Sequence, residues 1–276
     1  MNSNFAILIP ARIGSKRLKN KPLIDIKGMS LIERVFKNSI TITENTYIAT
    51  DSQEVLQHVQ SFSTNIVMTS DAHISGTDRV FEAAENLKIN DDTLIINLQG
   101  DEPFMPKDLV IQLVEDFNNN SCDVISACHP INNSDDLKNS NCVKVHCDSN
   151  NYAKSFQRTL NSNELSMRHI GIYGYRMKTL RKLVNLKPTK NELFHKLEQL
   201  RFMDNNYSIY MTHYKNEIPS GIDTQEDVDQ AINLEVILNE FNQTIGHTIF
   251  LNVSRDIIEK RIMGRMTCEK CNMTLN

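Results

Sequence analysis

Short apolar segments alternate with amphipathic helical segments through the first half of the chain. Residues 5–9, 46–49 and 65–68 are apolar runs of strand length, and helical spacing of apolar residues follows Asp51 and Pro106. Parallel strands need a crossover connection, usually a helix, so this alternation predicts an α/β fold with a mostly parallel sheet and helices on both faces. Asp51 is expected to cap the first of these helices.

Past Ala127 the alternation becomes irregular. Residues 143–145, 170–175 and 208–211 have strand character without regular helical segments between them. Strands of mixed direction are expected here, forming a smaller subregion that covers the first half of the chain.

A glycine turn with two carboxylates follows the apolar strand predicted over residues 93–98. The turn contains Gly100, Asp101 and Glu102. In an open α/β sheet, ligands bind at the carboxyl ends of the strands, and Mg²⁺ that bridges nucleotide phosphates takes one or two protein carboxylates. The turn therefore predicts a metal and phosphate site, with a purely structural acidic turn as the alternative.

The loop after the first strand is strongly basic. It contains Gly14 and Ser15 together with a run of cationic residues: Arg12, Lys16, Arg17, Lys19 and Lys21. Glycine and serine allow close backbone approach, and arginine and lysine donate charge-assisted hydrogen bonds to phosphate, so the loop predicts polyphosphate binding. Its spacing matches neither the Walker loop nor the dinucleotide-binding fingerprint, and the alternative is a solvated charged surface.

A second acidic position precedes a predicted amphipathic helix whose apolar residues recur at helical spacing: Val228, Ile232 and Val236. Either Asp223 or Thr224 can cap this helix, which would be a structural role. Alternatively, Asp223 could complete a metal site together with Asp101. The local sequence leaves both interpretations open.

Taken in order, these segments resemble the CMP-Kdo synthetases, the 3-deoxy-manno-octulosonate cytidylyltransferases. The resemblance runs from about Asn4 to about Glu240, and its specificity comes from the order of segments that are weak individually: residues 9–12, 17–23, 49–51, 75–79, 98–103, 169–176, 197–201 and 221–224. It implies a nucleotidyltransferase-like fold and an enzyme that joins CMP from CTP to the sugar acid Kdo, releasing pyrophosphate, for bacterial lipopolysaccharide. It also implies Mg²⁺ as cofactor, and the family is usually dimeric.

The resemblance assigns the predicted catalytic residues. It implies that Arg12 and Lys21 hold the triphosphate and that Asp101 and Asp223 hold Mg²⁺. Ser15 and Arg17 would support the basic loop. Nucleotide contacts are also implied for three further residues: Ser75, Arg79 and Gln99. Asp78 is expected to be a structural partner, and the alternative for this segment is a simple loop before a helix.

The sugar contacts implied by the resemblance come from the second half of the chain: Arg158, His169, Tyr173, Glu198 and Gln199, with Arg201 behind them. An anionic sugar with many hydroxyls calls for a basic anchor and several hydrogen-bonding groups. A single histidine near an apolar strand is more often packed in the core, and only the surrounding motif favours a sugar contact for His169. The acceptor stays open between Kdo, an amino-substituted Kdo and a sialic-acid-like sugar. A nucleotide-binding fusion protein without turnover is the non-enzymatic alternative.

The chain departs from the family pattern at two places in the catalytic region. Lys19 and Asn20 stand where the family usually has Pro-Gly, and asparagine tolerates the left-handed conformation that glycine would supply. The segment between Arg158 and His169 is shorter than in the family, which removes a peripheral loop at the rim of the sugar pocket.

The tail is a third departure. Residues 247–271 resemble the part of adenylate kinase that leads into its lid, but the Walker loop is absent and kinase activity is not implied. Cys268 and Cys271 would be half of a zinc knuckle, whereas a structural zinc site needs four ligands. We therefore expect a cytidylyltransferase domain over residues 1–241 and, over residues 242–276, a tail that is not an independent domain.

Composition narrows the class of protein. The chain has 276 residues, 40% apolar content and a formal net charge of -4, which suits one large α/β domain without general attraction to nucleic acid. A membrane span and a secretory signal are not expected, which predicts a cytoplasmic protein with free thiols. Four cysteines flank two apolar strands, a pattern typical of core thiols: Cys122 and Cys128, then Cys142 and Cys147.

Overall fold

The computed structural model describes most of the chain: residues 5–14, 17–131, 134–159, 166–219, 221–240, 266–267 and 274–275. The chain divides into two compact units, Met1–Ile237 and Leu238–Asn276. In the second unit, β10 (Met266–Thr267) pairs antiparallel with β11 (Thr274–Leu275). Several residues named above lie outside the described residues: Asn4, Ser15, Lys16, Cys268 and Cys271. Among the described helices, none is long and apolar enough to cross a membrane.

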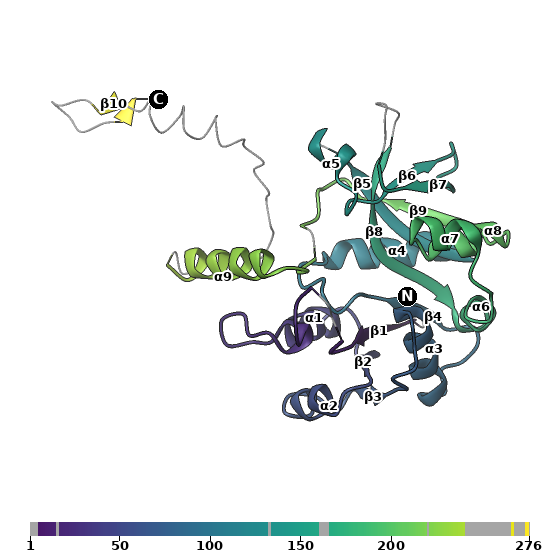
Figure 1. Ribbon diagram of the computed structural model, residues 1–276, viewed down its shortest axis with the longest axis horizontal. Helices are drawn as coiled ribbons and strands as arrows, with labels where there is room; N and C mark the ends of the chain where they lie inside the picture. Colours follow the sequence, from purple (N-terminus) through teal and green to yellow (C-terminus); the bar gives the residue numbers. More distant parts are fainter. Residues whose placement is uncertain are drawn as a thin grey trace. The chain divides into compact units, whose positions relative to one another are not determined.

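A single twisted sheet forms the centre of the first unit (Figure 1). Its main path runs in the order β3-β2-β1-β4-β8-β5-β9. The strands of this path are β1 (Phe5–Ala11), β2 (Thr46–Thr50), β3 (Ile66–Met68), β4 (Leu94–Asn97), β5 (Val124–Pro130), β8 (Met167–Arg176) and β9 (Ile209–His213). β1 pairs parallel with β2 and β4, β2 with β3, and β5 with β9, while β8 is antiparallel to both β4 and β5. The predicted α/β fold with a mostly parallel sheet is confirmed.

The later strands do not form a separate cover. β8 and β9 belong to the central sheet, so the expected cap over the first half is wrong in this respect. The mixed subregion is instead an extension in which β6 (Lys144–Cys147) pairs antiparallel with β7 (Ala153–Gln157) and with β8. This continuation is possible because β4 pairs only with residues 173–176 of β8, which leaves Met167 and Arg168 on the same edge of β8 for pairing with β6.

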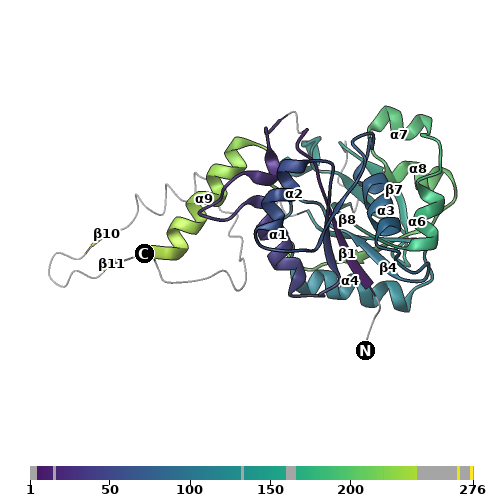
Figure 2. The ribbon, with the colours of Figure 1, turned by 90° about the horizontal axis from the view of Figure 1, so that it is seen from below.

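The helices connect the strands and cover both faces. They are η1 (Lys21–Leu23), α1 (Leu31–Ile40), α2 (Gln53–Gln60), α3 (Gly76–Asn86), α4 (Lys107–Asn119), α5 (Ser134–Lys138), α6 (Met177–Leu183), α7 (Lys190–His195), α8 (Gln199–Asp204) and α9 (Gln225–Glu240). Figure 2 shows α1 and α3 on opposite sides of β1. This arrangement leaves the ends of the strands open for a site.

Alternate residues of the buried strands supply two apolar clusters. On one face Ile7 and Ile9 of β1 pack with Ile32 of α1 and Leu109 of α4. On the other face Leu8 joins the cluster that contains residues of α3, α6 and α8: Val80, Leu180 and Phe202. Successive strand residues point to opposite faces, so one apolar strand serves both clusters.

Local capping follows the sequence with one correction. The side chain of Ser52, rather than Asp51, accepts a hydrogen bond from Val55 N at the start of α2. Serine is as good a cap as aspartate, so the change costs the helix nothing. It leaves the Asp51 carboxylate available for the long-range contact described below.

Candidate active site

A pocket of about 580 Å³ lies at the carboxyl ends of β1 and β4. Its wall is formed by residues of the basic loop, of the turn after β4 and of the segment that enters α3, together with Asp223. This is the position at which open α/β sheets bind ligands. The three segments that the sequence singled out for nucleotide and metal therefore converge on one cavity.

Lys21 joins the two predicted metal ligands. Its Nζ donates to the carboxylate of Asp101 and, at 2.7 Å, to Oδ1 of Asp223. Burial disfavours the ammonium, but attraction and hydrogen bonding to Asp101, with a further share from Asp223, raise the pKa of Lys21 above its ordinary value. The lysine is therefore a firmly protonated cation held between two carboxylates.

Two features of the basic loop place Lys21. Asn20 adopts the left-handed conformation, with φ of 52°, and forms the N-cap of η1, which begins at Lys21. Pro22, in the first turn of η1, has the fixed φ that a helical start needs. The expectation that asparagine would replace glycine at this turn is confirmed.

The turn after β4 needs its glycine. A Cβ on Gly100 would lie 2.8 Å from the carbonyl oxygen of Pro10, closer than real Cβ contacts. Only glycine therefore lets the acidic turn approach β1 so closely, and this approach sets Asp101 beside the basic loop.

The segment before α9 docks on the same turn. Ile222 N donates to the carbonyl oxygen of Asp101 at 2.9 Å, and a Cβ on Gly221 would lie 3.0 Å from that oxygen. This backbone contact carries Asp223 to Asp101, although 121 intervening residues separate them in the chain. The close fit explains why a glycine precedes Ile222.

The hydrogen bonds around Asp223 show which residues cap α9. Thr224 Oγ1 accepts from Asp227 N, and Asp227 Oδ2 accepts from the backbone N of both Asp223 and Thr224. Thr224 and Asp227 thus cap α9 reciprocally. The Asp223 carboxylate is left to face Lys21 and Arg17, whose Nη2 lies 3.0 Å from Asp223 Oδ2.

The remaining cations of the basic loop stay at the pocket. Arg12 is exposed and lines the cavity wall, and Arg17 lines it with 60% of its side chain exposed. Long, exposed cationic side chains can reach a bound anion without losing packed contacts. Arg12, Arg17 and Lys21 therefore form a cationic wall opposite Asp101 and Asp223.

The segment at the start of α3 forms a second wall. The Ser75 side chain accepts from Asp78 N at 3.1 Å and Asp78 Oδ2 accepts from Ser75 N at 3.3 Å, so the two form a capping box. The structural role expected of Asp78 is thereby confirmed. Ser75 and Gly76 line the pocket together with Gln99, whose Nε2 donates to Asn97 Oδ1 at 3.3 Å. The Gln99 amide is held in the wall by that bond.

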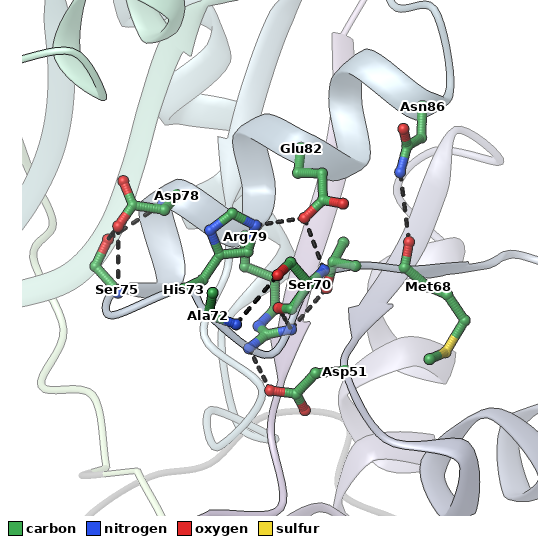
Figure 3. A network of polar contacts seen from close by, with 11 residues as sticks. Asp51, Met68, Ser70, Ala72, His73, Ser75, Asp78, Arg79, Glu82 and Asn86 are labelled. Atoms are coloured by element: carbon green, nitrogen blue, oxygen red, sulfur yellow. Dashed lines mark hydrogen bonds and ion pairs between the residues drawn. The ribbon is translucent and has the colours of Figure 1, made fainter.

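Arg79 lines the same pocket, but its guanidinium is already paired (Figure 3). Nη2 donates to Asp51 Oδ2 at 2.5 Å and Nη1 donates to Thr69 Oγ1 at 2.6 Å. Arg79 is only 2% exposed. The structure therefore places it as a buried link between α3 and the loops after β2 and β3, from which it supports the pocket wall.

His73 and Ile74 were not anticipated from the sequence, yet both line the pocket. His73 Nε2 pairs with Glu82 of α3, whose Oε2 also accepts from Ser70 N at 2.8 Å (Figure 3). Against a desolvation effect that raises it, the Ser70 and His73 hydrogen bonds lower the pKa of Glu82. The only sequence signal for these two residues is their position directly before the segment 75–79.

The predicted sugar contacts do not line this pocket, but two of them form a neighbouring group. His169 of β8 packs against Tyr173, with ring centroids 5.6 Å apart, and against Phe156, at 5.0 Å. Burial lowers the pKa of His169 to about 3, so the ring is neutral at ordinary pH. Burial likewise raises the pKa of Tyr173 well above its ordinary value. Both groups are thus uncharged hydrogen-bonding residues.

The hydrogen bonds of Ser126 indicate the tautomer of His169. Ser126 Oγ lies 2.8 Å from the Ile172 carbonyl and 3.2 Å from the Ile170 carbonyl, so its single hydrogen is directed to carbonyl oxygen. His169 Nε2, 2.9 Å from the same Oγ, must then be the donor. Nδ1 of His169 is left as an acceptor, which suits a hydroxyl ligand.

Glu198 links this group to the pocket wall. Its Oε2 accepts from Thr77 Oγ1 of α3 at 2.9 Å, and Gln199, the first residue of α8, is buried beside it. Burial raises the pKa of Glu198 against the opposing effects of Thr77 and Arg201. Arg201 itself forms a two-bond pair with Glu192, at 2.8 and 2.6 Å, and so stands behind Glu198 as expected.

Arg158 is placed differently from the expectation of a sugar anchor. Its guanidinium donates to three backbone carbonyls, those of His195 at 2.8 Å, Lys196 at 2.8 Å and Ser140 at 3.0 Å. These bonds tie the end of β7 to the end of α7. The structure brings His169 and Tyr173 into contact and places Glu198 close enough to act electrostatically on Tyr173, with Gln199 next to Glu198 in the chain. Arg158 instead joins two segments.

Comparisons with known proteins agree with this geometry. The family model for Cytidylyltransferase matches residues 6–212. A 3-deoxy-manno-octulosonate cytidylyltransferase of Psychromonas ingrahamii is 38% identical over 252 residues, covering 83% of this chain and 98% of that protein. One of Lawsonia intracellularis is 41% identical over 231 residues, covering 80% and 90%.

A solved structure of CMP:2-keto-3-deoxy-manno-octonic acid synthetase complexed with CTP is similar over 85% of this chain and 99% of that chain. It has a TM-score of 0.79 and 32% sequence identity. The resemblance of the tail to adenylate kinase finds no support in these matches. On sequence and fold together, this chain belongs to the cytidylyltransferase family, as a member of its 3-deoxy-manno-octulosonate group.

Proposed function

We propose that this protein transfers CMP from CTP to Kdo, with pyrophosphate as the leaving group. The observation that carries the proposal is the convergence of a cationic wall and two carboxylates in one pocket, at the carboxyl ends of β1 and β4. In such a reaction the sugar hydroxyl attacks the α-phosphorus in line and negative charge grows on the pyrophosphate. Positioning and charge neutralisation are then the main sources of rate.

The cationic wall suits the leaving group. Arg12, Arg17 and Lys21 approach the pocket from one loop, so their charges act on neighbouring phosphate oxygens. Arginine binds phosphate through paired N–H donors, whereas lysine acts as a compact charge. We assign Arg12 and Arg17 to the outer phosphates and Lys21 to the reacting end of the triphosphate.

Asp101 and Asp223 fit a role as Mg²⁺ ligands. Their oxygens meet at the Lys21 ammonium, so a point already exists in this structure where both carboxylates contact one cation. Hard carboxylate oxygens are the ligands that Mg²⁺ prefers. When bound, Mg²⁺ would neutralise phosphate charge.

Lys21 gives the site a stand-in cation before substrates arrive. In the nucleotide-free chain its ammonium offsets the repulsion between Asp101 and Asp223. When the triphosphate enters with its own metal, phosphate oxygens would offer the Lys21 ammonium anionic partners in place of the carboxylates. The same residue therefore serves both the empty site and the occupied one.

Selection of the base is assigned to the wall formed at the start of α3. Gly76 and Gln99 present backbone and amide groups to the pocket, which suit the donor and acceptor edge of cytosine. The Ser75 hydroxyl is bonded to Asp78 and would shape this wall. Arg79 would hold this wall in place rather than contact cytosine, because its guanidinium already donates to Asp51 and Thr69.

The acceptor is assigned to the neighbouring group around His169. Neutral His169, Tyr173, Glu198 and Gln199 offer hydrogen bonds to hydroxyl groups without a net repulsion of the sugar carboxylate, provided that Glu198 keeps its proton. The anionic group of the sugar would then face the cationic loop.

Three further points are part of the proposal. A homodimer would bury Leu193 and Phe194 of α7, which are 66% and 82% exposed. Light scattering during size-exclusion chromatography would test the dimer. The cytoplasmic location and the boundary of the catalytic domain near residue 241 stay predictions.

Pyrophosphate release across a panel of substrates tests the function. We expect release to require Mg²⁺, CTP and Kdo together, with amino-substituted Kdo and sialic acid as competing acceptors. Equal release with UTP or ATP in place of CTP would overturn the assignment of the base wall. Release with CTP and sialic acid but not Kdo would change the acceptor while keeping the reaction class.

A further inference from the structure

A cluster of three metal-ligating side chains lies outside the pocket described above. It contains Cys128, Cys147 and His213, whose ligand atoms all lie within 4.8 Å of one another. They come from β5, β6 and β9, so the cluster joins segments that are distant in the sequence. The proposed reaction uses none of these side chains.

The sheet topology explains why they meet. β5 and β9 are parallel neighbours in which Cys128 is directly opposite His213, so both side chains point to the same face. The third ligand arrives through the β6–β7 hairpin, which contacts β9 where Met211 N donates to Asn151 O at 2.8 Å. These three segments are seen together in Figure 1.

The alternation of side chains along β6 aims the third ligand. Val145 and Cys147 are two positions apart and both contact the apolar cluster that contains Cys128, whereas His146 between them is exposed. The register between β6 and β7 shifts between His146 and Cys147, and Cys147 keeps its place on the buried side despite this irregularity.

One thiol of the cluster differs from ordinary core thiols. Burial raises the pKa of Cys122 to about 12, and burial also raises the pKa of Cys142. The hydrogen bond between Cys128 and Cys147 raises the pKa of Cys128 and lowers that of Cys147, and His213 adds a smaller lowering effect on Cys147. Thiolate is the form that binds metals, so Cys128 would release its proton when a metal binds. The pattern expected for core thiols therefore holds for Cys122, Cys128 and Cys142 but not for Cys147.

We propose that Cys128, Cys147 and His213 form a binding site for a thiophilic divalent cation, with Zn²⁺ as its occupant. Thiolate and imidazole ligands select Zn²⁺ over Mg²⁺, which sets this site apart from Asp101 and Asp223. In tetrahedral zinc sites neighbouring ligand atoms are roughly 3.5 to 3.8 Å apart, a spacing that these side chains reach by small rotations.

The exposure of the three ligands indicates where the fourth coordination position of the metal lies. Cys128 is buried and Cys147 is partly buried, whereas the side chain of His213 is exposed. The site therefore opens toward solvent on the His213 side, where a water molecule completes the coordination. Bound Zn²⁺ would tie β5, the β6–β7 hairpin and β9 together, and Cys128 is the cross-strand partner of His169 on β8. Zinc would thus stiffen the strands that hold the acceptor group.

Zinc binding by the reduced full-length chain tests the proposal. The reference protein carries Cys268→Ser and Cys271→Ser, so that the tail thiols cannot bind the metal. After removal of metals with a chelator, equilibrium dialysis against Zn²⁺ under a phosphine reductant is followed by elemental analysis. We expect one Zn²⁺ per chain with a dissociation constant tighter than about 1 μM.

Single substitutions in the reference protein locate the site. Loss of a residue that only hydrogen-bonds to a metal ligand weakens metal binding by roughly 10- to 100-fold. We expect Cys147→Ser and His213→Asn each to weaken zinc binding by more than this, because each removes a ligand itself. Cys122→Ser is the matched control, because it removes a partly buried thiol outside the cluster and should leave affinity unchanged. His213 is exposed, so His213→Asn should melt as cooperatively as the reference protein.

Cobalt supplies a signature that a purely structural role would not produce. Co²⁺ in the site should give thiolate charge-transfer absorption and the strong visible bands of tetrahedral coordination, both lost in Cys147→Ser and kept in Cys122→Ser. Zinc affinity unchanged by Cys147→Ser and His213→Asn would overturn the proposal. So would a reduced protein that binds no Zn²⁺ while oxidation joins Cys128 to Cys147.

Discussion

Lys21 Nζ lies 2.7 Å from Oδ1 of Asp223 and also donates to Asp101, so one ammonium joins the basic loop both to the turn after β4 and to the segment before α9. The lysine side chain is 12% exposed, whereas that of Asp223 is 42% exposed. The two carboxylates face one another across this ammonium, so a cation is needed at this point, either Lys21 or a bound metal.

Replacing Lys21 by methionine keeps the side-chain length and removes the charge. In the absence of metal and nucleotide we expect Lys21→Met to lower stability by roughly 1 to 3 kcal/mol, less than the loss from a fully buried pair because Asp223 is partly exposed. Millimolar Mg²⁺ should recover more of this loss than it adds to the unsubstituted protein. Thermal melting with and without Mg²⁺ measures both effects.

Lys37→Met is the control for this experiment. Lys37 forms a surface pair with Glu33 at 2.8 Å within α1, so its loss should cost no more than about 0.5 kcal/mol and should not respond to Mg²⁺. An equal Mg²⁺ response in both variants would contradict a cation site at Asp101 and Asp223.

The carboxylates themselves should matter for turnover rather than for folding. We expect Asp101→Asn and Asp223→Asn each to lower kcat by more than about 100-fold, because several kcal/mol of charge stabilisation depends on each metal ligand. Melting temperatures should change little, because the substitutions conserve volume and Lys21 keeps the other carboxylate as its partner in each variant. Asp92→Asn, which removes a surface partner of Lys178, is a suitable control. A normally active Asp101→Asn protein would refute the metal assignment.

Substitutions of Asn20 test whether its left-handed turn positions Lys21 for CTP binding. Alanine at a left-handed position costs about 1 to 2 kcal/mol, so Asn20→Ala should destabilise the protein and also raise KM for CTP by displacing Lys21. Asn20→Gly should retain both properties. Asn206→Ala is the control. Asn206 also has a left-handed backbone, with φ of 62°, but lies outside the pocket, so this variant should lose similar stability and keep the same KM for CTP.

Acid stability should depend on His169. Its folded pKa of about 3 lies below the ordinary value of 6.5, so the unfolded chain binds a proton that the folded chain excludes as pH falls between those values. The stability present above pH 6.5 is therefore lost toward pH 3, by up to ~1.4 kcal/mol per pH unit for this one group.

His169→Asn tests this dependence because asparagine does not titrate. Its stability should fall less steeply with acid than that of the unsubstituted protein, as measured by denaturant unfolding from pH 7 to pH 4. His146→Asn changes an exposed histidine and should leave the slope as it was. Parallel curves for the unsubstituted protein and His169→Asn would show that the ring is not buried in its neutral form.

The tail should be dispensable for the reaction. Every residue assigned to the pocket or to the acceptor group precedes residue 225, and the family model ends at residue 212. We expect a chain ending at Asn242 to keep near-full cytidylyltransferase activity and to be more soluble than the whole chain. If the shortened chain melts cooperatively but is inactive, the tail belongs to the site or to an oligomer interface, and the boundary near residue 241 is wrong.

The sequence by itself determined the elements and the segments that carry the chemistry. Strand and helix periodicity, the glycine turn before Asp101 and the left-handed turn at Asn20 depend on neighbouring residues, so they can be predicted locally. The ordered motifs likewise indicated the family. Even so, Ser52 took the cap expected of Asp51, because adjacent polar residues compete for the same backbone donors.

Tertiary structure alone decided which charged groups are paired. Lys21 meets Asp223, and Arg79 meets Asp51, only after the order of the sheet has brought their strand ends together. Arg158 likewise donates to carbonyls that the neighbouring helix happens to present. Such pairings depend on distances between segments far apart in the chain, and those distances follow from packing and hydrogen bonding across the sheet rather than from local spacing.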